Sequence, residues 1–497
     1  MRTEMSRRKV LQGLATGVAV VGWNPLVGGW VTAAEASRPG TRPVPRLDGE
    51  LATDPATLAA FAGDFGRLIE APPWAVLRPG SVHDVVKMVG YARRNGLTVA
   101  VNGQGGPPGV RESHSSYGQA TAPGGIAVDA RSLATIHHIG HTWADVDAGV
   151  SWADLVTAAA AQGRTPPVLT DFLHLSVGGT LSVGGTGGTM QRAGTQADNV
   201  VELQVVTGRG QLVTCSRTRR PDLFDAVLAG AGQCGLIVRA KVRLVPAETQ
   251  ALVFTLFYDD LATYLADQVM VMQDGRFSYQ EGHLEPRQDG AGWRFMMEVA
   301  AYYTPPAEPD RDALLAGLSD DRGAAVVVDQ PYLDWAFRLD PVVAQLVAGG
   351  FWDQPKPWLT LFLPGSVTAG VVESLLAQLT PDQMGVGPAS LYPVDTTTIT
   401  RPLFAVPDEP VAFQLNLLRF PFPGYPDIDG LLAQNRAFYD EAVAGGGTRY
   451  VIGAVPDMTA ADWRHHFGDR WDAFARAKRR FDPDAVLTPG QGIFPPP

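Results

Sequence analysis

Two glycine-rich stretches contain the residues that could hold a phosphorylated cofactor. The first covers 103–125 and begins with Gly103-Gln104-Gly105-Gly106, and the second covers 178–188. Glycine allows backbone N–H groups to approach a ligand closely, and such groups bind pyrophosphate oxygens. Neither stretch has the G-x-G-x-x-G spacing of a dinucleotide fingerprint, and the sequence has no Gly-Lys-Ser/Thr P-loop. The glycines therefore predict a nucleotide cradle of a different kind.

The segments around these glycines alternate between helical and strand patterns. Ser81 precedes valines with helical spacing, and Ser151 with Asp154 forms a capping box. The residues between 200 and 215 predict a hairpin around Gly208-Arg209-Gly210. Helices are predicted over 82–95, 152–162, 435–444 and 460–480, and strands over 97–101, 126–129, 200–207 and 211–215.

The length of 497 residues exceeds what one ordinary core holds and predicts at least two domains. Aromatic residues and long proline-rich connections become frequent after Pro246. The terminal segment 487–494 is apolar and should fold back onto the first domain. The expected organisation is a signal (1–36), a linker and N-terminal segment (37–71), a cofactor domain (72–246), a substrate or cap domain (247–430) and a C-terminal segment that returns to the cofactor domain (431–497).

Composition and charge exclude several classes of protein. With 45% hydrophobic and 18% charged residues, the chain has the opposite balance from a disordered one. The net charge of −11 and the absence of a basic face argue against nucleic-acid binding. The two cysteines, Cys215 and Cys234, cannot build a disulfide framework or a four-ligand zinc site. We expect two buried free thiols and no metal site.

The N-terminus resembles a twin-arginine export signal. Ser6-Arg7-Arg8-Lys9 precedes an uncharged, glycine-containing stretch from Val10 to Ala34, and Ala34-Glu35-Ala36 offers a small-x-small cleavage site. A retained membrane anchor is the alternative, although the glycines and Asn24-Pro25 weaken a helix there. The interpretation is a secreted or periplasmic protein that meets a membrane only through this signal.

Several ordered motifs carry a resemblance to a known family. His114-Ser115-Ser116-Tyr117-Gly118-Gln119-Ala120 is similar to Gly-His-Ser-x-x-Gly-Gln-Ala, and 170–182 is similar to Thr-Asp-Tyr-Leu-x-Leu-Thr-Val-Gly-Gly-Thr-Leu-Ser. Tyr279-Gln280-Glu281-Gly282, Pro357-Trp358-Leu359-Thr360-Leu361-Phe362 and Pro489-Gly490-Gln491 follow in the same order. These motifs resemble the cytokinin dehydrogenases, within the vanillyl-alcohol-oxidase-type covalent FAD oxidoreductases. The similarity covers nearly all of the chain beyond the signal.

The resemblance implies an α+β fold of two domains. The first would be a PCMH-type FAD-binding domain, and the second an α+β cap over an antiparallel sheet. The cofactor would be FAD, attached covalently through His114. A solvated loop histidine is the alternative interpretation, because Ser113 replaces the family's glycine and 106–112 resembles an insertion. No cysteine lies near 169–172, so a second covalent flavin bond is not expected.

The resemblance also assigns residues to the cofactor and to the reaction. Asp171 would take the N–H proton of the substrate, and Glu281 would face it across the substrate and tune its proton affinity. A helix-capping Asp171 and a surface Glu281 are the alternatives. The expected FAD contacts are Gly103, Gln104, Gly105, His114, Ser115, Gln119, Asp171, Ser176, Gly178, Gly179, Ser182, Thr186, Ile237, Tyr450 and Gln491.

The predicted substrate positions depart from the family pattern. Ile399 stands where the family has a tryptophan, and Val451 replaces a leucine. A planar purine would lose a stacking partner. The catalytic pair matches the family but this pocket does not, so the substrate need not be a cytokinin itself. The leading expectation from the resemblance is an enzyme that oxidises a secondary allylic amine, such as a cytokinin, to an imine that water cleaves. An alcohol or sugar-lactone oxidase on the same fold and a non-catalytic flavoprotein are the alternatives. The partners would be a small-molecule substrate and either oxygen or a quinone as electron acceptor.

Overall fold

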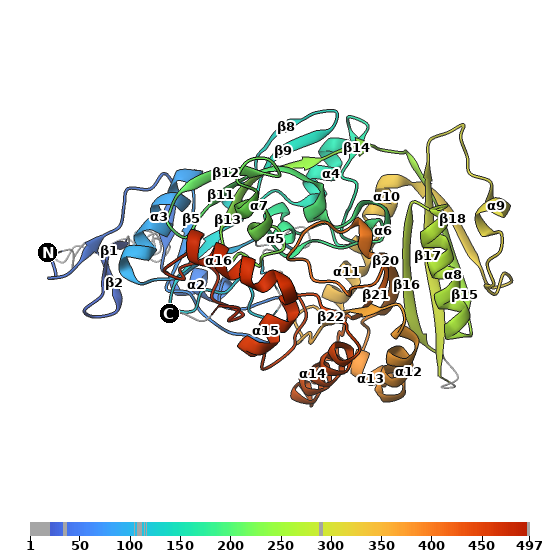
Figure 1. Cartoon of the computed structure of the whole chain (residues 1–497). Helices are drawn as coiled ribbons and strands as arrows, with labels where there is room; N and C mark the ends of the chain where they lie inside the picture. Colours follow the sequence, from blue (N-terminus) through green and yellow to red (C-terminus); the bar gives the residue numbers. More distant parts are fainter. Residues whose placement is uncertain are drawn as a thin grey trace, which may run out of the picture.

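The computed structural model describes residues 20–32, 37–103, 105–106, 112–113, 115, 117–287 and 292–494. Figure 1 shows two bodies side by side: the first half of the chain with the C-terminal helices, and the cap built from the middle of the chain. The described residues contain no helix that is long and apolar enough to cross a membrane.

The first body contains two larger sheets with helices packed around them, besides a small N-terminal sheet described below and the pair β10 (Arg164–Thr165) and β14 (Val245–Pro246). The first of these sheets has the order β4 (Glu50–Ala52), β5 (Ala75–Arg78), β7 (Ile126–Asp129), β6 (Val99–Asn102). Strands β5, β7 and β6 are parallel, and β4 is antiparallel to β5. The antiparallel second sheet has the order β12 (Leu212–Ser216), β11 (Val200–Val206), β13 (Leu236–Arg243), β9 (Trp143–Asp147), β8 (Ile136–Ile139). The helices in this first half of the chain are α2 (Pro55–Ala60), α3 (Val82–Asn95), α4 (Trp152–Ala160), α5 (Val177–Val183), α6 (Met190–Ala193) and α7 (Pro221–Val227).

The cap is an eight-stranded antiparallel sheet. Its order is β18 (Val326–Pro331), β15 (Gln250–Tyr258), β17 (Trp293–Tyr303), β16 (Tyr279–Pro286), β20 (Ala389–Asp395), β21 (Val411–Leu417), β19 (Leu359–Pro364), β22 (Thr448–Arg449). One face packs its apolar side chains against α8 (Leu261–Asp274), α12 (Thr368–Gln378) and α14 (Ile428–Ala444). The cap also contains α9 (Arg311–Leu315), α10 (Tyr332–Ala336), α11 (Leu339–Ala348) and α13 (Pro381–Met384). The opposite face of the sheet borders a cavity toward the first body.

Local sequence signals explain several of these elements. Ser151 caps α4 by accepting a hydrogen bond from the Asp154 backbone N–H, as the capping box predicts. Gly96 ends α3 in the left-handed conformation, which glycine adopts without strain. Cys215 and Cys234 are buried free thiols, as predicted. The α+β two-domain fold with an antiparallel cap sheet is confirmed.

The structure differs from the predicted boundaries at the C-terminus. The expected return to the first domain begins at 431, but α14 and β22 still belong to the cap. The predicted helix 460–480 is divided into α15 (Ala460–Phe467) and α16 (Trp471–Phe481), because the backbone at Gly468 has a positive φ of 51°. The final segment does pack on the first body, where Leu487 pairs with Val99.

The N-terminal region also differs from its prediction. Residues 1–19 and 33–36 of the proposed signal lie outside the described residues. The residues between them form a hairpin of β1 (Val20–Asn24) and β2 (Gly29–Thr32), and β1 pairs with β3 (Arg42–Pro43). Trp23 is buried and stacks on Trp74 at 4.8 Å, and the Trp23 backbone N–H donates to the Tyr91 hydroxyl at 2.9 Å. Part of the stretch expected outside the fold is therefore packed on it.

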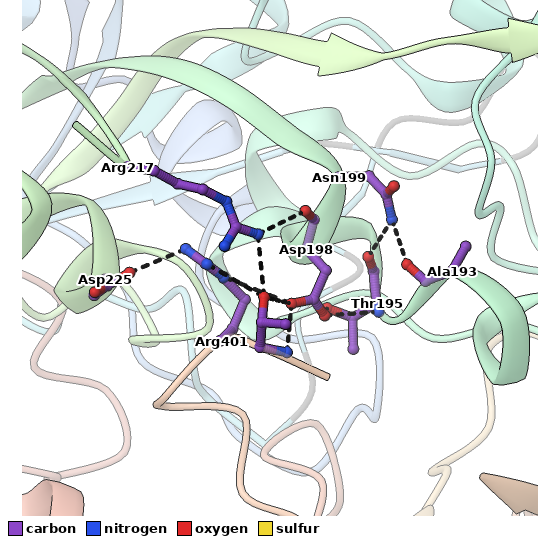
Figure 2. A network of polar contacts seen from close by, with 8 residues as sticks. Ala193, Thr195, Asp198, Asn199, Arg217, Asp225 and Arg401 are labelled. Atoms are coloured by element: carbon purple, nitrogen blue, oxygen red, sulfur yellow. Dashed lines mark hydrogen bonds and ion pairs between the residues drawn. The ribbon is translucent and has the colours of Figure 1, made fainter. Parts of the chain in front are cut away.

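A polar network joins the two bodies away from the cavity (Figure 2). The buried Asp198 carboxylate accepts from the backbone N–H and hydroxyl of Thr195, at 2.9 and 2.8 Å, and from those of Thr400, at 2.8 and 2.7 Å. Arg401, in the connection from β20 to β21, lies 3.6 Å from Asp198 and donates to Asp225 at 3.0 Å. The cap connection is thereby tied to the first body.

Candidate active site

The cavity between the first body and the cap has a volume of about 810 Å³. The glycine-rich stretches form one side, and the face of the cap sheet that carries Glu281 forms the other. Helix α11 contributes Leu339, Val342, Val343 and Leu346 to its wall. A mostly pre-formed, concave site of this size is typical of small-molecule and cofactor binding.

Most of the predicted cofactor residues lie together on this cavity. The residues that border it are Gly103, Gly105, Ser115, Gln119, Asp171, Ser176, Gly178, Gly179, Ser182, Thr186, Ile237 and Tyr450. Gln104 and His114 lie outside the described residues. Sequence segments more than 300 positions apart thus meet on one surface.

Close backbone contacts explain why glycines stand at this wall. A Cβ added to Gly103 would lie 2.3 Å from the Ser176 hydroxyl oxygen, and one added to Gly178 would lie 2.7 Å from the Ala148 Cβ. Ser176 caps α5 by accepting from the Gly179 N–H at 3.2 Å. The Gly185 N–H donates to the Tyr450 hydroxyl at 3.0 Å, which fixes the second glycine stretch. The glycines therefore allow the loop, the helix start and the neighbouring strand to approach one another.

Three predicted residues lie elsewhere. Gln491 does not border the cavity, and its side-chain N–H donates to the Val451 carbonyl at 3.0 Å. Ile399 and Val451, predicted to contact substrate, pack instead with the main hydrophobic cluster of the first body. The neighbouring Ile452 borders the cavity in place of Val451. Val451 lies in the turn after β22 and Ile399 at the end of a short 3-10 helix, so no strand or helix period predicts which side chain faces the cavity.

Aromatic side chains from unexpected segments supply the stacking surface that Ile399 lacks. Five rings border one end of the cavity or pack directly around it: Phe65, Phe172, Trp352, Trp358 and Phe420. Phe65 meets Trp352 and Trp358 edge-on at centroid distances of 5.2 and 4.8 Å. These rings offer a planar ligand aromatic partners other than the one that is absent at position 399.

Asp171 is held by a cluster of polar side chains from the cap. Arg338, at the junction of α10 and α11, donates from Nη2 to Asp171 Oδ1 at 2.6 Å. The Tyr279 hydroxyl of β16 donates to the same oxygen at 2.9 Å. The Arg338 guanidinium also lies over the rings of Trp335 and Tyr279, at 4.2 and 4.9 Å from their centroids. The side chain of Asp171 retains 29% exposure at the cavity.

Glu281 shares a hydrogen bond with Asp171, so the two carboxyl groups are neighbours in the structure. From the sequence we expected Asp171 and Glu281 to face each other across the substrate. Burial and the adjacent Asp171 charge raise the pKa of Glu281 well above its ordinary value. Burial would also raise the pKa of Asp171, but Arg338 and the hydrogen bonds from Glu281, Arg338 and Tyr279 hold it below its ordinary value. The proton of the pair therefore resides on Glu281, and Asp171 carries the charge.

This arrangement can accept a proton from a bound ligand. Asp171 is ionised at neutral pH and partly open to the cavity, and Glu281 can stabilise it by donating a hydrogen bond. Glu298, which is opposite Glu281 in the register of β16 and β17, adds a third carboxyl group to the wall. Burial raises the pKa of Glu298, which favours its neutral form.

Arg338 and Tyr279 were not identified from the sequence as site residues. Arg338 lies in an apolar helical segment far from the glycine motifs, with no spacing that links it to Asp171. Tyr279 belongs to the motif that contains Glu281, and its i, i+2 spacing from Glu281 was a usable signal, because such residues share a face of a strand such as β16.

The cavity wall fits FAD, the cofactor implied by the sequence. Gly103, Gly105, Gly178 and Gly179 leave backbone groups without side chains at the surface, and Ser115, Ser176 and Ser182 add hydroxyl groups. These are suitable partners for a pyrophosphate and ribityl chain. Asp171 lies at the opposite, cap-facing part of the same cavity. No group of three or more potential metal ligands occurs among the described residues.

Comparison with known proteins agrees with this geometry. A family model described as cytokinin dehydrogenase 1, FAD and cytokinin binding, matches residues 287–494, and an FAD binding domain model matches 73–216. An uncharacterized oxidoreductase in the fasciation locus of Rhodococcoides fascians is 40% identical, over 88% of this chain and 97% of its own length. Cytokinin dehydrogenase 5 of Oryza sativa subsp. japonica is 34% identical, over 90% of this chain and 92% of its own.

Two further similarities extend the comparison. Cytokinin dehydrogenase 2 of Arabidopsis thaliana is 33% identical, over 89% of this chain and 93% of its own. The crystal structure of 6-hydroxy-D-nicotine oxidase from Arthrobacter nicotinovorans superimposes with a TM-score of 0.66 at 23% identity, over 90% of this chain and 98% of that one, which shows a shared fold. The chain therefore belongs to the cytokinin dehydrogenase family and is an FAD-dependent oxidoreductase with a PCMH-type flavin domain.

Proposed function

We propose that this enzyme oxidises the C–N bond of a secondary allylic amine, such as a cytokinin. The observation that carries the proposal is the ionised Asp171, which receives hydrogen bonds from Glu281, Arg338 and Tyr279 at the wall of the cavity. The names of the cytokinin dehydrogenase relatives support the substrate class, at 33–34% identity. The aromatic rings at one end of the cavity are compatible with a planar base.

The reaction requires removal of one proton and one hydride from the substrate. Asp171 would accept the proton from the substrate nitrogen, while Glu281 keeps its own proton and continues to donate to Asp171. A flavin bound at the glycine loops would accept the hydride from the carbon next to that nitrogen. The resulting imine adds water and separates into an aldehyde and a free amine. Arg338 would balance the Asp171 charge before the proton arrives.

The direct test is flavin bleaching under anaerobic conditions. The purified enzyme should be reduced by N6-isopentenyladenine, and a panel of polyols serves as the comparison for alcohol or sugar oxidation. Asp171→Asn should slow reduction by roughly 10² to 10⁴-fold while FAD remains bound. Asp145→Asn, which removes a carboxylate paired with Arg239 in the same body but away from the cavity, is the control and should leave the rate unchanged. Bleaching by polyols alone would contradict amine oxidation.

We also propose that His114 carries FAD covalently and that Gln104 assists its binding. The motif around His114 supports this assignment, and the residue lies outside the described part of the structure. Acid precipitation separates covalent from free flavin: yellow fluorescence should stay with the polypeptide in the wild type and be released in His114→Ala. Release from the wild type would exclude the bond.

Export through the twin-arginine motif is proposed from the sequence alone. Replacing Arg7 and Arg8 with lysine should leave the protein inside the cell, whereas the unchanged protein should appear in the extracytoplasmic fraction. The electron acceptor would be oxygen or a quinone. Stopped-flow reoxidation of the reduced enzyme with each acceptor distinguishes an oxidase from a dehydrogenase.

A further inference from the structure

A second cavity lies behind Asp171, at the junction of the first body and the cap. Its volume is about 330 Å³. Its wall consists of residues from 165–171, 189–193 and 245–248 of the chain and of residues from β16, β17 and α10 of the cap. We call it the rear cavity, and the larger cavity described above the main cavity.

Asp171 and Arg338 stand between the two cavities. Both residues border the main and the rear cavity, as do Thr170 and Trp335. Tyr279, in contrast, is part of the wall of the rear cavity and not of the main one. Its hydroxyl donates to Asp171 Oδ1 at 2.9 Å and accepts from Arg338. The Asp171–Arg338 ion pair therefore forms a thin partition, with Tyr279 on its rear side.

The rear cavity extends from this partition to the protein surface. Three residues of its wall, Arg192, Pro246 and Glu248, are exposed. A polar cavity of this size can hold several water molecules. Hydroxyl groups that can bind such waters belong to Thr165, Thr189, Ser278, Tyr302 and Tyr332 in the wall. Water in the rear cavity can thus connect the partition with solvent.

The main cavity is a poor exit for a proton during the reaction. The substrate must reach Asp171 from the main cavity, where FAD also binds, so the two ligands cover the side of Asp171 that faces it. A general base that has accepted a proton must lose it before it can act again. Without another route, the proton would stay on Asp171 until the product leaves.

Tyr279 has the properties of a group that passes a proton. Burial raises the pKa of Tyr279 well above its ordinary value, so its phenol keeps its hydrogen at neutral pH. A hydroxyl group has one hydrogen to donate and two lone pairs to accept with. The Tyr279 oxygen can therefore accept from Arg338 and from a protonated Asp171 at the same time, while its hydrogen turns to a water molecule in the rear cavity.

We propose that the rear cavity is the proton exit of this enzyme and that Tyr279 passes the proton from Asp171 to it. The protonated Asp171 gives its proton to the Tyr279 oxygen, and the earlier O–H bond of Tyr279 breaks as its hydrogen moves to a water molecule, which becomes hydronium. Asp171 is again a carboxylate and Tyr279 again a phenol, and no electron is transferred. This inference rests on Asp171 as the base of the proposed function, whether the substrate is an amine or an alcohol.

The experiment follows the electrons and the proton separately in an anaerobic stopped flow. The holoenzyme is mixed, in weak buffer with a pH indicator, with N6-isopentenyladenine or with whichever polyol bleaches the flavin. Flavin absorbance reports hydride transfer, and the indicator reports the other proton of the substrate once it reaches solvent. In the wild type the two rate constants should be equal, because the proton leaves while the product is still bound.

Two variants close the exit at different points. Tyr279→Phe removes the hydroxyl group and keeps the ring, and Ala193→Leu narrows the rear cavity at the end of α6. In each, the ratio of the proton-release to the reduction rate constant should fall at least about tenfold, since a positioned proton-transfer group contributes roughly 10²- to 10⁴-fold. Ala160→Leu is the matched control, because Ala160 is also the half-buried last residue of a helix, α4, and borders neither cavity. Its ratio should stay at one.

The outcomes separate this inference from the proposed function. A ratio of one in both variants, or a delayed proton in the wild type, would overturn the rear exit while leaving amine oxidation intact. A delay in Ala193→Leu alone would exclude Tyr279 as the relay, and a delay in Tyr279→Phe alone would exclude the rear cavity as the route. Bleaching by polyols alone, with a delay in both variants, would contradict amine oxidation and support the exit. If neither the amine nor any polyol reduces the wild type, both are wrong.

Discussion

Arg338 donates a 2.6 Å hydrogen bond to Asp171 although the two residues are separated by 167 positions in the sequence. Asp171 lies between the two glycine stretches and Arg338 lies in the cap, so their contact spans the boundary between the two bodies. The ionisation state of the proposed base consequently depends on how the cap is seated. The same boundary is fixed independently by the Asp198 network, which includes Arg401 of the β20–β21 connection (Figure 2).

Removing the Arg338 charge should change the pH dependence of flavin reduction. Burial raises the pKa of Asp171 and Arg338 offsets this, so Arg338→Met should move that pKa upward. Because the base works in its ionised form, the variant should lose rate as the pH falls through the raised pKa, so its acid limb should lie at higher pH than that of the wild type. The wild type should show no such limb above the ordinary aspartate pKa. A partial return of the wild-type profile in Arg338→Lys would assign the effect to charge; identical profiles in all three proteins would exclude it.

Glu281→Gln should stabilise the protein above the ordinary glutamate pKa. Burial and the Asp171 charge raise the pKa of Glu281 in the folded state. The contribution of Glu281 to the free energy of unfolding is therefore fully present below its pKa in the unfolded chain, 4.5, and is lost as the pH rises toward its pKa in the folded protein. Glutamine does not titrate and can still donate to Asp171. The free energy of unfolding of Glu281→Gln should exceed that of the wild type by about 1.4 kcal/mol for each unit by which the pKa of Glu281 is raised, and this difference should vanish near pH 4. Thermal unfolding over pH 4 to 8 provides the check, and a constant difference between the proteins would refute the linkage.

The Asp198 network should contribute strongly to stability. Asp198→Ala removes a buried carboxylate with four hydrogen bonds and leaves Arg401 with a buried, less compensated charge. We expect a loss of about 3 kcal/mol in the free energy of unfolding. Asp222→Ala, which breaks an exposed ion pair with Arg480, is the control and should cost at most about 1 kcal/mol. Similar effects of the two variants in denaturant titrations would show that the network does not hold the bodies together.

Gly103→Ala should reduce FAD retention. The new Cβ would lie 2.3 Å from the Ser176 hydroxyl oxygen, so the loop or the start of α5 must move. Both segments border the cavity, and the ratio of bound flavin to protein should fall several-fold in absorbance spectra. Gly370→Ala, in α12 with open space around its Cβ, is the control. It should keep the full flavin content and gain up to about 1 kcal/mol of helix stability. If Gly103→Ala retained all of its flavin, the close contact between the loop at Gly103 and the start of α5 would not be needed for FAD binding.

The amino-acid sequence alone predicts three features: the two glycine-rich stretches at the cofactor site, the two-domain α+β organisation, and the presence of Asp171 and Glu281 in one site. These features depend on local requirements: glycine where backbones approach, Ser151 and Ser176 at helix starts, and a short motif around each carboxylate. Such requirements are encoded within a few neighbouring positions, and family motifs preserve them in order.

Only the tertiary structure decided which side chains complete the site. It brought Arg338 to Asp171, and it placed Ile399 and Val451 in the hydrophobic core instead of at the cavity. It also aligned Ser390, Asn416 and Thr360 from three separate strands into one polar row. The reason is physical: the docking of the cap sets the Arg338 contact, and the register of β19, β20 and β21 sets the polar row, whose side chains a shift of one residue would turn to the opposite face of the sheet.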